Sequence, residues 1–339
     1  MSAVTPSSKS CWIALAAFQV LFAGACGHDS ARPSSPVSAS STAPATPAQI
    51  VIPPADAAPP AAQTGGFDGA EAYDQVAKLV AFGPHPPASD AIHAVQKYIH
   101  SQLESFGCSV DEDDFNAQTE LGSLTMKNIV AKIPGTGQGI ILLLTHYDTK
   151  RVDNFVGAED AGSSTGLMLE MARILCGRPK QSSAAWIVFL DGEETQAQFN
   201  WKTADSIYGS RELAAHMALT GELKRVRAVI LADMIGQYGL HLLRDSDSPK
   251  WLTDMVWDTA ARLRYQSVFV SQATSTEDDN LPFLERHVPV IDLIDLDDYI
   301  RLGYWHTSQD TLDKISPRSL AIVGHVILES VNALQNKFH

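Results

Sequence analysis

Histidine and carboxylate side chains follow three apolar runs of this sequence, at the point where each run ends. "THYDTK" begins at the end of the run at residues 140–144, "DGEET" follows "AAWIVFL", and an aspartate follows "AVILA". If the runs are parallel strands, ligands bind beyond their carboxyl ends, so the polar side chains should meet in one crevice. Imidazole nitrogens and carboxylate oxygens are the atoms that bind zinc or carry protons in enzymes. The side chains concerned are His146, Asp148, Asp191, the pair Glu193–Glu194 and Asp233.

A catalytic zinc usually has three protein ligands and one open position. The candidates are Asp160, Glu194 and His306. Asp160 opens the predicted helix "DAGSSTGLMLEMARIL", where the helix dipole also favours a carboxylate. His306 lies far along the chain in "YWHTSQDT", as expected when the ligands come from separate strand ends. His146 and Asp233 are candidates for a second metal position beside the first.

Each ligand candidate also has a purely structural interpretation. Asp160 would be a helix cap, His306 a loop histidine and Glu194 part of a solvated turn. The adjacent glutamates are harder to explain in this way, because two carboxylates directly after a buried strand repel each other unless a cation or a proton compensates. One glutamate can then bind the metal while its neighbour, Glu193, faces the substrate as general base.

Length and composition favour one catalytic domain and exclude other classes of function. The chain has 339 residues, of which 45% are hydrophobic and 19% charged, and its net charge of -14 disfavours a nucleic-acid partner. Helical patterns alternate with continuous apolar runs, which is typical of a largely parallel sheet covered on both faces. We therefore predict a single α/β domain over residues 67–339, with a central, largely parallel mixed sheet flanked by helices. The expected strands lie at residues 128–133, 140–145, 185–190, 228–232 and 288–294, and a helix is expected over residues 317–335.

The N-terminal part is expected to lie outside this domain. Residues 1–26 have one charge before an apolar stretch and end in small residues before Cys26, which resembles a bacterial lipoprotein processing site. An ordinary signal peptide cut nearby is the alternative. Residues 27–66 are rich in Pro, Ser and Ala and are predicted to be a disordered tether. The protein is then a periplasmic or cell-envelope lipoprotein, or secreted, and Cys108 and Cys176 are free to form a disulfide, although the sequence leaves their pairing open.

Seven ordered blocks of the sequence resemble one enzyme family. They are "THYDTK", "GAEDAGSSTGLMLEMAR", "FLDGEET", "DSIYGSRELA", "LADMIG", "EDDNLPFLERHVPVIDLI" and "YWHTSQDTLDKI". They resemble the zinc-dependent glutaminyl cyclases of the animal type, the glutaminyl-peptide cyclotransferases, which are related to di-zinc aminopeptidases. The resemblance covers residues 71–339 and implies a zinc aminopeptidase-like fold.

Carried over block by block, the resemblance implies a role for each candidate residue. One Zn²⁺ would be bound by the three ligand candidates, and Glu193 would be the general acid/base, with Asp233 and Asp278 in its hydrogen-bond network. Trp201 and Trp305 would line a compact pocket for an N-terminal glutamine, together with Glu277. Ordinary packing is the alternative for both tryptophans.

Three positions depart from the animal pattern. Thr145 stands in place of a half-cystine, and Asn280 in place of a histidine. Residues 295–304 are longer and more acidic than the corresponding animal loop. This last difference leaves the far wall of the pocket undefined by the resemblance.

The resemblance implies a reaction and leaves an alternative open. A cyclase converts the N-terminal glutamine of a peptide to pyroglutamate and releases ammonia, with zinc polarising the γ-carbonyl. A secreted di-zinc aminopeptidase would use the same residues, with His146 and Asp233 joining Asp160 around a second Zn²⁺ and Glu193 activating water. A non-catalytic binding module on the same fold is the third hypothesis. Peptide N-termini are the expected partners, and the protein is expected to be a monomer, with membrane contact only through a lipid anchor at Cys26.

Overall fold

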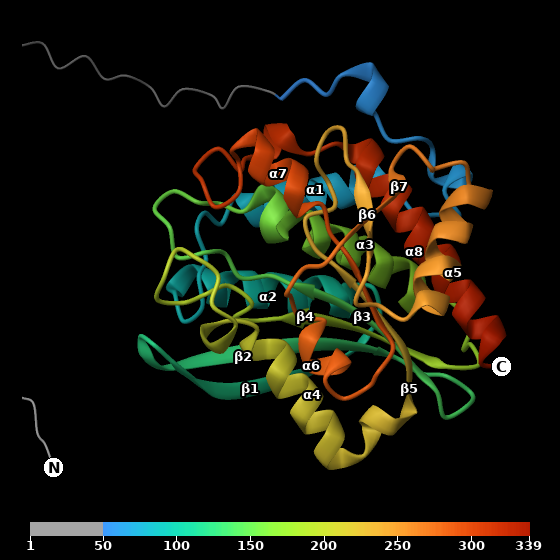
Figure 1. The fold of residues 1–339 in the computed structure, drawn as a ribbon, viewed down its shortest axis with the longest axis horizontal. Coiled ribbons are helices and arrows are strands. Elements are labelled where there is room, and N and C mark those ends of the chain that lie inside the picture. The colour runs from blue at the N-terminus through green and yellow to red at the C-terminus, as the bar shows by residue number, and fades with distance from the viewer. Residues whose placement is uncertain (1–49) are drawn as a thin grey trace, which may run out of the picture. The chain divides into compact units, whose positions relative to one another are not determined.

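A six-stranded mixed sheet carries the candidate residues at the ends of its strands (Figure 1). The structure is a computed structural model and describes residues 50–339. The strand order is β1-β2-β4-β3-β5-β8, in which β2 pairs antiparallel with β1 and β4 and the remaining pairs are parallel. The prediction of a largely parallel mixed sheet is confirmed. The strands are β1 (Ser109–Thr119), β2 (Gly122–Ile133), β3 (Ile140–His146), β4 (Ala184–Leu190), β5 (Val226–Ala232) and β8 (Val290–Leu293).

The register places the carboxyl ends of the four parallel strands at one edge of the sheet. His146 at the end of β3 is opposite Leu190 at the end of β4, and Ala232 at the end of β5 is opposite Leu293 at the end of β8. Residues that directly follow these strands therefore begin at the same edge. This alignment is what brings distant parts of the sequence to one site.

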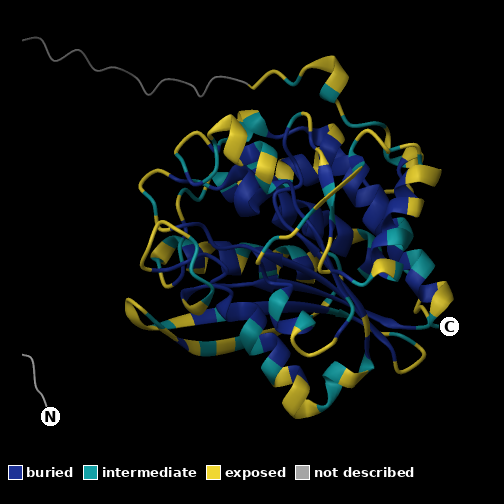
Figure 2. Cartoon of the chain, viewed as in Figure 1, coloured by how far each residue is buried: buried dark blue, intermediate teal, exposed yellow. Residues whose placement is uncertain are grey.

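Helices cover both faces of the sheet, and the strands β3, β4 and β8 are buried throughout (Figures 1 and 2). Side chains alternate between the faces along β3, so that Ile141 and Leu143 pack on one helical layer and Leu142 and Leu144 on the other. Burying such a side chain fully stabilises the fold by about 1.5–3 kcal/mol. One layer consists of α1 (Gly69–Val80), α2 (Asp90–Ser105), α3 (Ser164–Cys176), α5 (Lys250–Arg262) and α8 (Pro317–Lys337), and the other of α4 (Tyr208–Thr220) and α6 (Leu281–Leu284).

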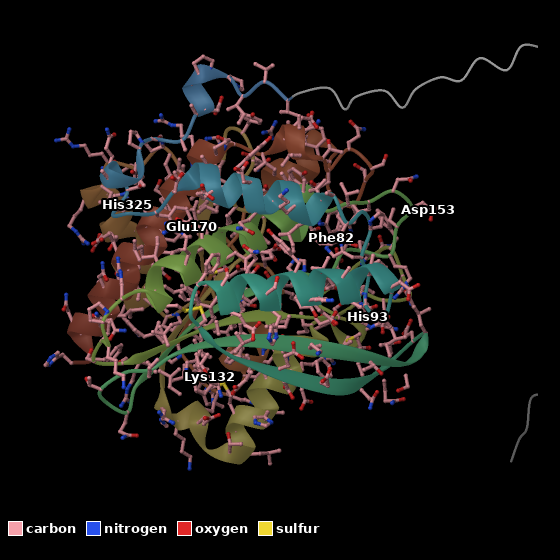
Figure 3. The ribbon with its side chains drawn as sticks, turned by 180° about the vertical axis from the view of Figure 1, so that it is seen from behind. Phe82, His93, Lys132, Asp153, Glu170 and His325 are labelled. Atoms are coloured by element: carbon pink, nitrogen blue, oxygen red, sulfur yellow. A yellow bond between two sulfur atoms is a disulfide. The ribbon has the colours of Figure 1, made fainter. Side chains whose placement is uncertain are left out.

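The helix expected over residues 317–335 is present as α8, and a serine and a glycine mark the two ends of α2. The Oγ of Ser89 accepts a hydrogen bond from the backbone N–H of Ile92 and caps α2. After α2 the chain turns at Gly107, whose φ of 77° lies in the left-handed region. In the view from behind, α1 and α2 lie in front of α3 and the sheet (Figure 3).

Several elements were not predicted. The edge strand β1 carries the acidic run "DEDD", and its exposed positions hide the apolar pattern that marks a buried strand. A separate two-stranded sheet consists of β6 (Leu242–Asp245) and β7 (Phe269–Thr274). The helix α7 (Leu296–Leu302) lies in the acidic segment that departs from the animal pattern.

Two residues between 50 and 66 pack on the domain, in a segment that was expected to be a disordered tether. Ile52 packs on the main hydrophobic core, and Thr64 is fully buried, with its Oγ1 donating to the carbonyl of Phe67. The side chains of this segment are too small and too few to form a hydrophobic core of their own. They can still pack against the core of the folded domain. The predicted export signal and the tether up to residue 49 lie outside the described residues.

Two further features bear on the expectations from the sequence. Cys108, just before β1, and Cys176, at the end of α3, form a disulfide with a Cα–Cα distance of 5.2 Å. Among the described helices, none is long and apolar enough to cross a bilayer.

Candidate metal centre and substrate pocket

The three predicted metal ligands meet at the carboxyl edge of the sheet. His306 Nε2 lies 3.3 Å from Asp160 Oδ2 and 3.2 Å from Glu194 Oε1. One ligand atom from each residue lies within 4.8 Å of the other two, and all three residues are buried. One histidine nitrogen and two carboxylate oxygens are of the kinds that bind catalytic zinc, so this group is a candidate metal site.

The electrostatics of this trio fit a bound cation. Burial lowers the pKa of His306, but the carboxylates of Glu194 and Asp160 raise it to about 9. Burial raises the pKa of Asp160, whereas hydrogen bonds from His146 and His306 lower it, and the net shift is downward. Glu194 Oε1 has no hydrogen-bond partner among the described residues, although it is buried. A buried carboxylate oxygen without a donor is where a metal ion would bind, so the residues present fit Zn²⁺.

A second trio lies directly beside the first. His146 Nε2 is 3.1 Å from Asp233 Oδ1 and 3.3 Å from Asp160 Oδ1. Asp160 therefore directs one carboxylate oxygen toward each histidine. The structure thus brings together all five residues that the sequence proposed as ligands, including both candidates for a second position.

Asp160 is positioned by a turn rather than by a helix terminus. α3 begins at Ser164, and Asp160 lies in the preceding turn Ala158–Ser163 with non-helical backbone angles, so the expected helix start was four residues too early. The Asp160 carboxylate caps no helix. Instead, the Asp310 carboxylate accepts the backbone N–H groups of Glu159 (2.8 Å) and Asp160 (3.2 Å), and accepts the Tyr299 hydroxyl at 2.6 Å. Sequence reasoning missed Asp310, although it lies in the same block as His306.

The turn also depends on a glycine. Gly157 has a φ of 59°, and a Cβ at this position would lie 2.1 Å from the carbonyl oxygen of Asp160. Any other residue would displace the backbone that carries the shared ligand.

The paired glutamates are held by residues of "THYDTK". Asp148 accepts the backbone N–H groups of Glu193 (3.1 Å) and Glu194 (3.4 Å). The Nζ of Lys150 lies 3.3 Å from Glu194 Oε2, and the lysine is 1% exposed. The sequence placed Asp148 among the crevice residues without a role of its own, and Lys150 was not predicted. The available signal was the position of both residues just after a buried strand. A lysine that is buried at such a place needs an acidic partner, because lysine is almost never fully buried unless it is paired.

Glu193 lies in the cavity with an environment suited to proton transfer. Burial raises its pKa well above the ordinary value, the charges of Glu194 and Asp278 raise it further, and His146 opposes them. The hydrogen-bond network of Glu193 with Asp233 and Asp278 stays a prediction. Asp233 is hydrogen-bonded to His146, and Asp278 accepts its neighbour's backbone N–H, so no described hydrogen bond joins either to Glu193. The three carboxyl groups are coupled through their charges instead.

A cavity of about 310 Å³ opens from the metal centre and contains the predicted substrate residues. Trp305 stacks on His306 with ring centroids 3.9 Å apart. Trp201 donates from its Nε1 to Glu277 at 3.0 Å, and this bond and one from Thr203 lower the pKa of Glu277. Both tryptophans and Glu277 line the cavity, as expected. Its far wall, which the sequence left undefined, includes residues 274–276, Ile294, Leu296 and Asp297.

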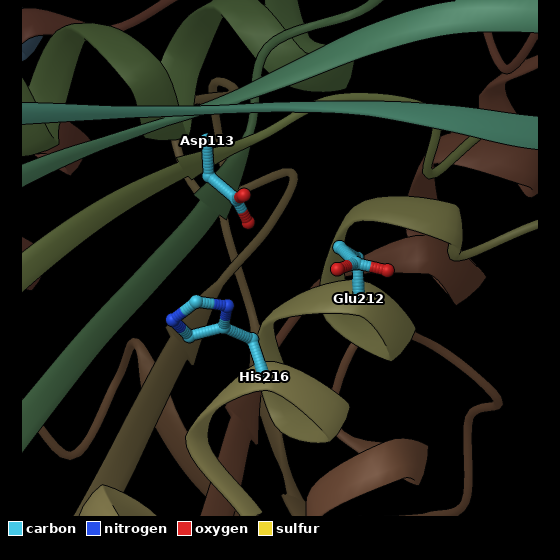
Figure 4. A group of neighbouring side chains, drawn as sticks. All are labelled: Asp113, Glu212 and His216. Carbon is cyan, nitrogen blue, oxygen red and sulfur yellow. The ribbon is translucent and has the colours of Figure 1, made fainter. Parts of the chain in front are cut away.

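A third group of metal-binding side chain types lies on the opposite face of the sheet from α3. Asp113 of β1 and Glu212 and His216 of α4 point toward a common space (Figure 4). None of the three is buried, and solvated carboxylates need no ion for compensation. The group lies outside the cavity, and we assign it no part in the site.

The family follows from a match that covers more than half of the chain. Residues 128–331 match the family model of peptidase family M28. The chain belongs to peptidase family M28. All five ligand candidates of this M28 chain and Glu193 lie within the matched residues.

Relatives of this M28 chain include both cyclases and peptidases. The glutaminyl-peptide cyclotransferase of Bothrops jararaca is 32% identical over 73% of this chain and 77% of its own length. The crystal structure of an Acidobacteriales bacterium glutaminyl cyclase is 38% identical with a TM-score of 0.75, covering 80% of this chain and 96% of that one. A Zn-dependent exopeptidase from Parabacteroides distasonis is 26% identical with a TM-score of 0.72, over 80% and 98% of the chains. The resemblance indicated by the sequence blocks is confirmed.

Proposed function

We propose that this protein is a zinc-dependent glutaminyl-peptide cyclotransferase, which converts the N-terminal glutamine of a peptide to pyroglutamate and releases ammonia. The observation that carries the proposal is the buried trio Asp160, Glu194 and His306 at the inner end of a compact cavity with two tryptophans in its wall. The likeness to glutaminyl cyclases at 38% and 32% identity supports the same reaction.

The trio would bind one Zn²⁺, which when bound polarises the γ-carbonyl of the glutamine and stabilises the charge on its oxygen. We assign the single ion to this trio because Glu194 Oε1 has no hydrogen-bond partner among the described residues, whereas Asp233 Oδ1 of the second trio is hydrogen-bonded to His146. His146 and Asp233 then act as support for Asp160.

The residues of the cavity supply position and proton transfer. The α-amine and the γ-amide belong to one residue, so holding the curled conformer already gives a high effective concentration. Trp305, fixed by its stacking on His306, and Trp201, fixed by its bond to Glu277, shape the cavity around that conformer. As the amine nitrogen attacks the carbonyl carbon of the γ-amide, Glu193 accepts a proton from the amine and returns it to the amide nitrogen, which leaves as NH₃ when the C–N bond breaks.

The aminopeptidase alternative uses the second trio as well, and both trios are assembled here. We do not favour it, because the more similar relatives named above are cyclases and the cavity is compact. A binding module that has lost its ligands is disfavoured by the five candidate ligands in place.

The test uses the purified, zinc-loaded chain with a Gln-peptide and a Leu-peptide in parallel. We expect ammonia and a peptide lighter by one NH₃ from the first, and no change in the second. Release of a free N-terminal amino acid from either peptide would favour the peptidase. Glu193→Gln should abolish cyclisation while the zinc content stays unchanged, and full activity in this variant would refute the role of Glu193.

We further propose that the protein works outside the cytoplasm as a monomer, with peptide N-termini as its substrates. The disulfide between Cys108 and Cys176 supports this location, since disulfides persist in oxidising compartments. A lipid anchor at Cys26 stays a prediction, which mass spectrometry of the mature N-terminus would check.

A further inference from the structure

The acidic helix α7 leaves one of its carboxylates without a structural partner. Asp295 is buried and accepts hydrogen bonds from Gln237 Nε2, the His241 N–H and the Asp298 N–H. Asp298 pairs with His241 and Arg301. Asp297, between them, is exposed, and its carboxylate makes no hydrogen bond or ion pair within residues 50–339. The fold therefore uses two of the three acids, and the third is free at the wall of the cavity.

The cavity has an unbalanced charge. Of the described residues that line it, none is a lysine or arginine, whereas seven are acids. Five of the acids are buried around the metal centre, and Glu277 and Asp297 are exposed toward solvent. His306 and a bound Zn²⁺ would offset the acids of the inner end, so the uncompensated negative charge lies with Glu277 and Asp297 at the exposed end, where it concentrates cationic ligands. The seven are Asp160, Glu193, Glu194, Asp233, Glu277, Asp278 and Asp297.

A buried acceptor in the same cavity also lacks a donor. Asp278 is 2% exposed and its Oδ2 has no hydrogen-bond partner among the residues described. An unsatisfied buried oxygen is costly, and a donor supplied by a bound molecule removes the cost. This points independently to a ligand that brings N–H groups into the cavity.

The place of the second and third residues of a peptide follows from the proposed reaction. An N-terminal glutamine fills the inner end, so the rest of the peptide must leave through the exposed end. The wall there contains Leu296, which is half-buried, directly next to Asp297. An apolar surface beside a free carboxylate suits a lysine or arginine, whose aliphatic stem packs while its charged head binds the acid.

We propose that Asp297 makes this enzyme select peptides with lysine or arginine directly after the N-terminal glutamine or one position further. The proposal rests on the proposed cyclase function. Asp297 is a specificity-determining residue and takes no part in the chemistry.

The experiment compares kcat/KM for Gln-peptides that differ only at the second or third residue, which is Lys, Ala or Glu. We expect the Lys peptide to exceed the Glu peptide by about tenfold at low salt, a difference that shrinks as salt screens the charge. Asp297→Asn should reduce the ratio to about twofold with little effect on the Ala peptide. Asp258→Asn, which changes the net charge equally at an exposed site away from this cavity, should leave the ratio unchanged.

Two outcomes would overturn the proposal: an unchanged ratio in Asp297→Asn, or an equal loss in Asp258→Asn. Ammonia from none of the peptides would instead refute the proposed function. In that case, titration of the same peptides into the Glu193→Gln variant still gives the Kd of each peptide, because this measurement needs no turnover. Equal Kd values for Lys and Glu peptides there would overturn the proposal on its own.

Discussion

The Nζ of Lys150 lies 3.3 Å from Glu194 Oε2 in the interior of the protein, where both side chains are almost fully buried. No described hydrogen bond engages this ammonium group. Lys150 thus neutralises one oxygen of Glu194 and leaves the other, Oε1, directed toward His306. The ammonium group of Lys150 and a bound metal ion would then each contact one oxygen of the Glu194 carboxylate.

Replacing Lys150 by methionine should therefore destabilise the metal-free protein more than the zinc-loaded protein. Removing one partner of a buried ion pair costs about 3–5 kcal/mol, because the remaining charge is uncompensated. Bound zinc would compensate Glu194 and reduce this loss. Denaturant unfolding with and without zinc measures the two values.

The control is Lys132→Met on β2 (Figure 3), because Lys132 forms a partly exposed pair with Asp111. Such a pair contributes about 0.2–1 kcal/mol, and the effect should not depend on zinc. An equal loss with and without zinc in Lys150→Met would show that Lys150 has no link to the metal centre.

Asp310→Asn should weaken zinc binding without unfolding the protein. The carboxylate supports the turn of Asp160 through two backbone N–H groups and Tyr299, and an amide offers one oxygen in place of two. Losing such support of a ligand typically lowers metal affinity 10–100-fold. Competition with a chelator measures the Kd for zinc, and Tyr299→Phe, which removes one bond, should have the smaller effect. A wild-type Kd in Asp310→Asn would contradict this account of the turn.

Loss of the disulfide should lower stability and leave activity intact. Cys108 and Cys176 close a loop across 68 positions of the sequence, and the chain-entropy model assigns such a cross-link about 4 kcal/mol. Cys108→Ser should therefore lower the free energy of unfolding, while kcat stays unchanged because neither cysteine lines the cavity. The Cys108→Ser variant and the reduced wild-type protein should have the same free energy of unfolding. A fall in kcat at temperatures where the variant is fully folded would contradict this expectation.

The ends of the buried strands could be predicted from the sequence because their signal is local. The run at residues 140–144 is apolar throughout, and the polar residue at its end, His146, lies at the sheet edge where parallel strands place ligands. His146, Glu193, Glu194 and Asp233 were found in this way.

What was missed depends on long-range contacts. The turn of Asp160 is held by Asp310, 150 residues later, and no periodicity marks such a pairing. The hydrogen bond between Asp233 and His146 depends on side-chain geometry at the ends of β3 and β5. β1 was missed because an edge strand with charges on its exposed positions lacks an apolar alternation.

The central claim is that Asp160, Glu194 and His306 bind the one zinc ion on which cyclisation depends. The most direct measurement is ammonia release from a Gln-peptide while metal-free protein is titrated with Zn²⁺. We predict that activity rises to a plateau at one equivalent in the wild type and that His306→Ala stays inactive over the same range. A plateau at two equivalents, or recovery of activity in His306→Ala, would contradict the claim.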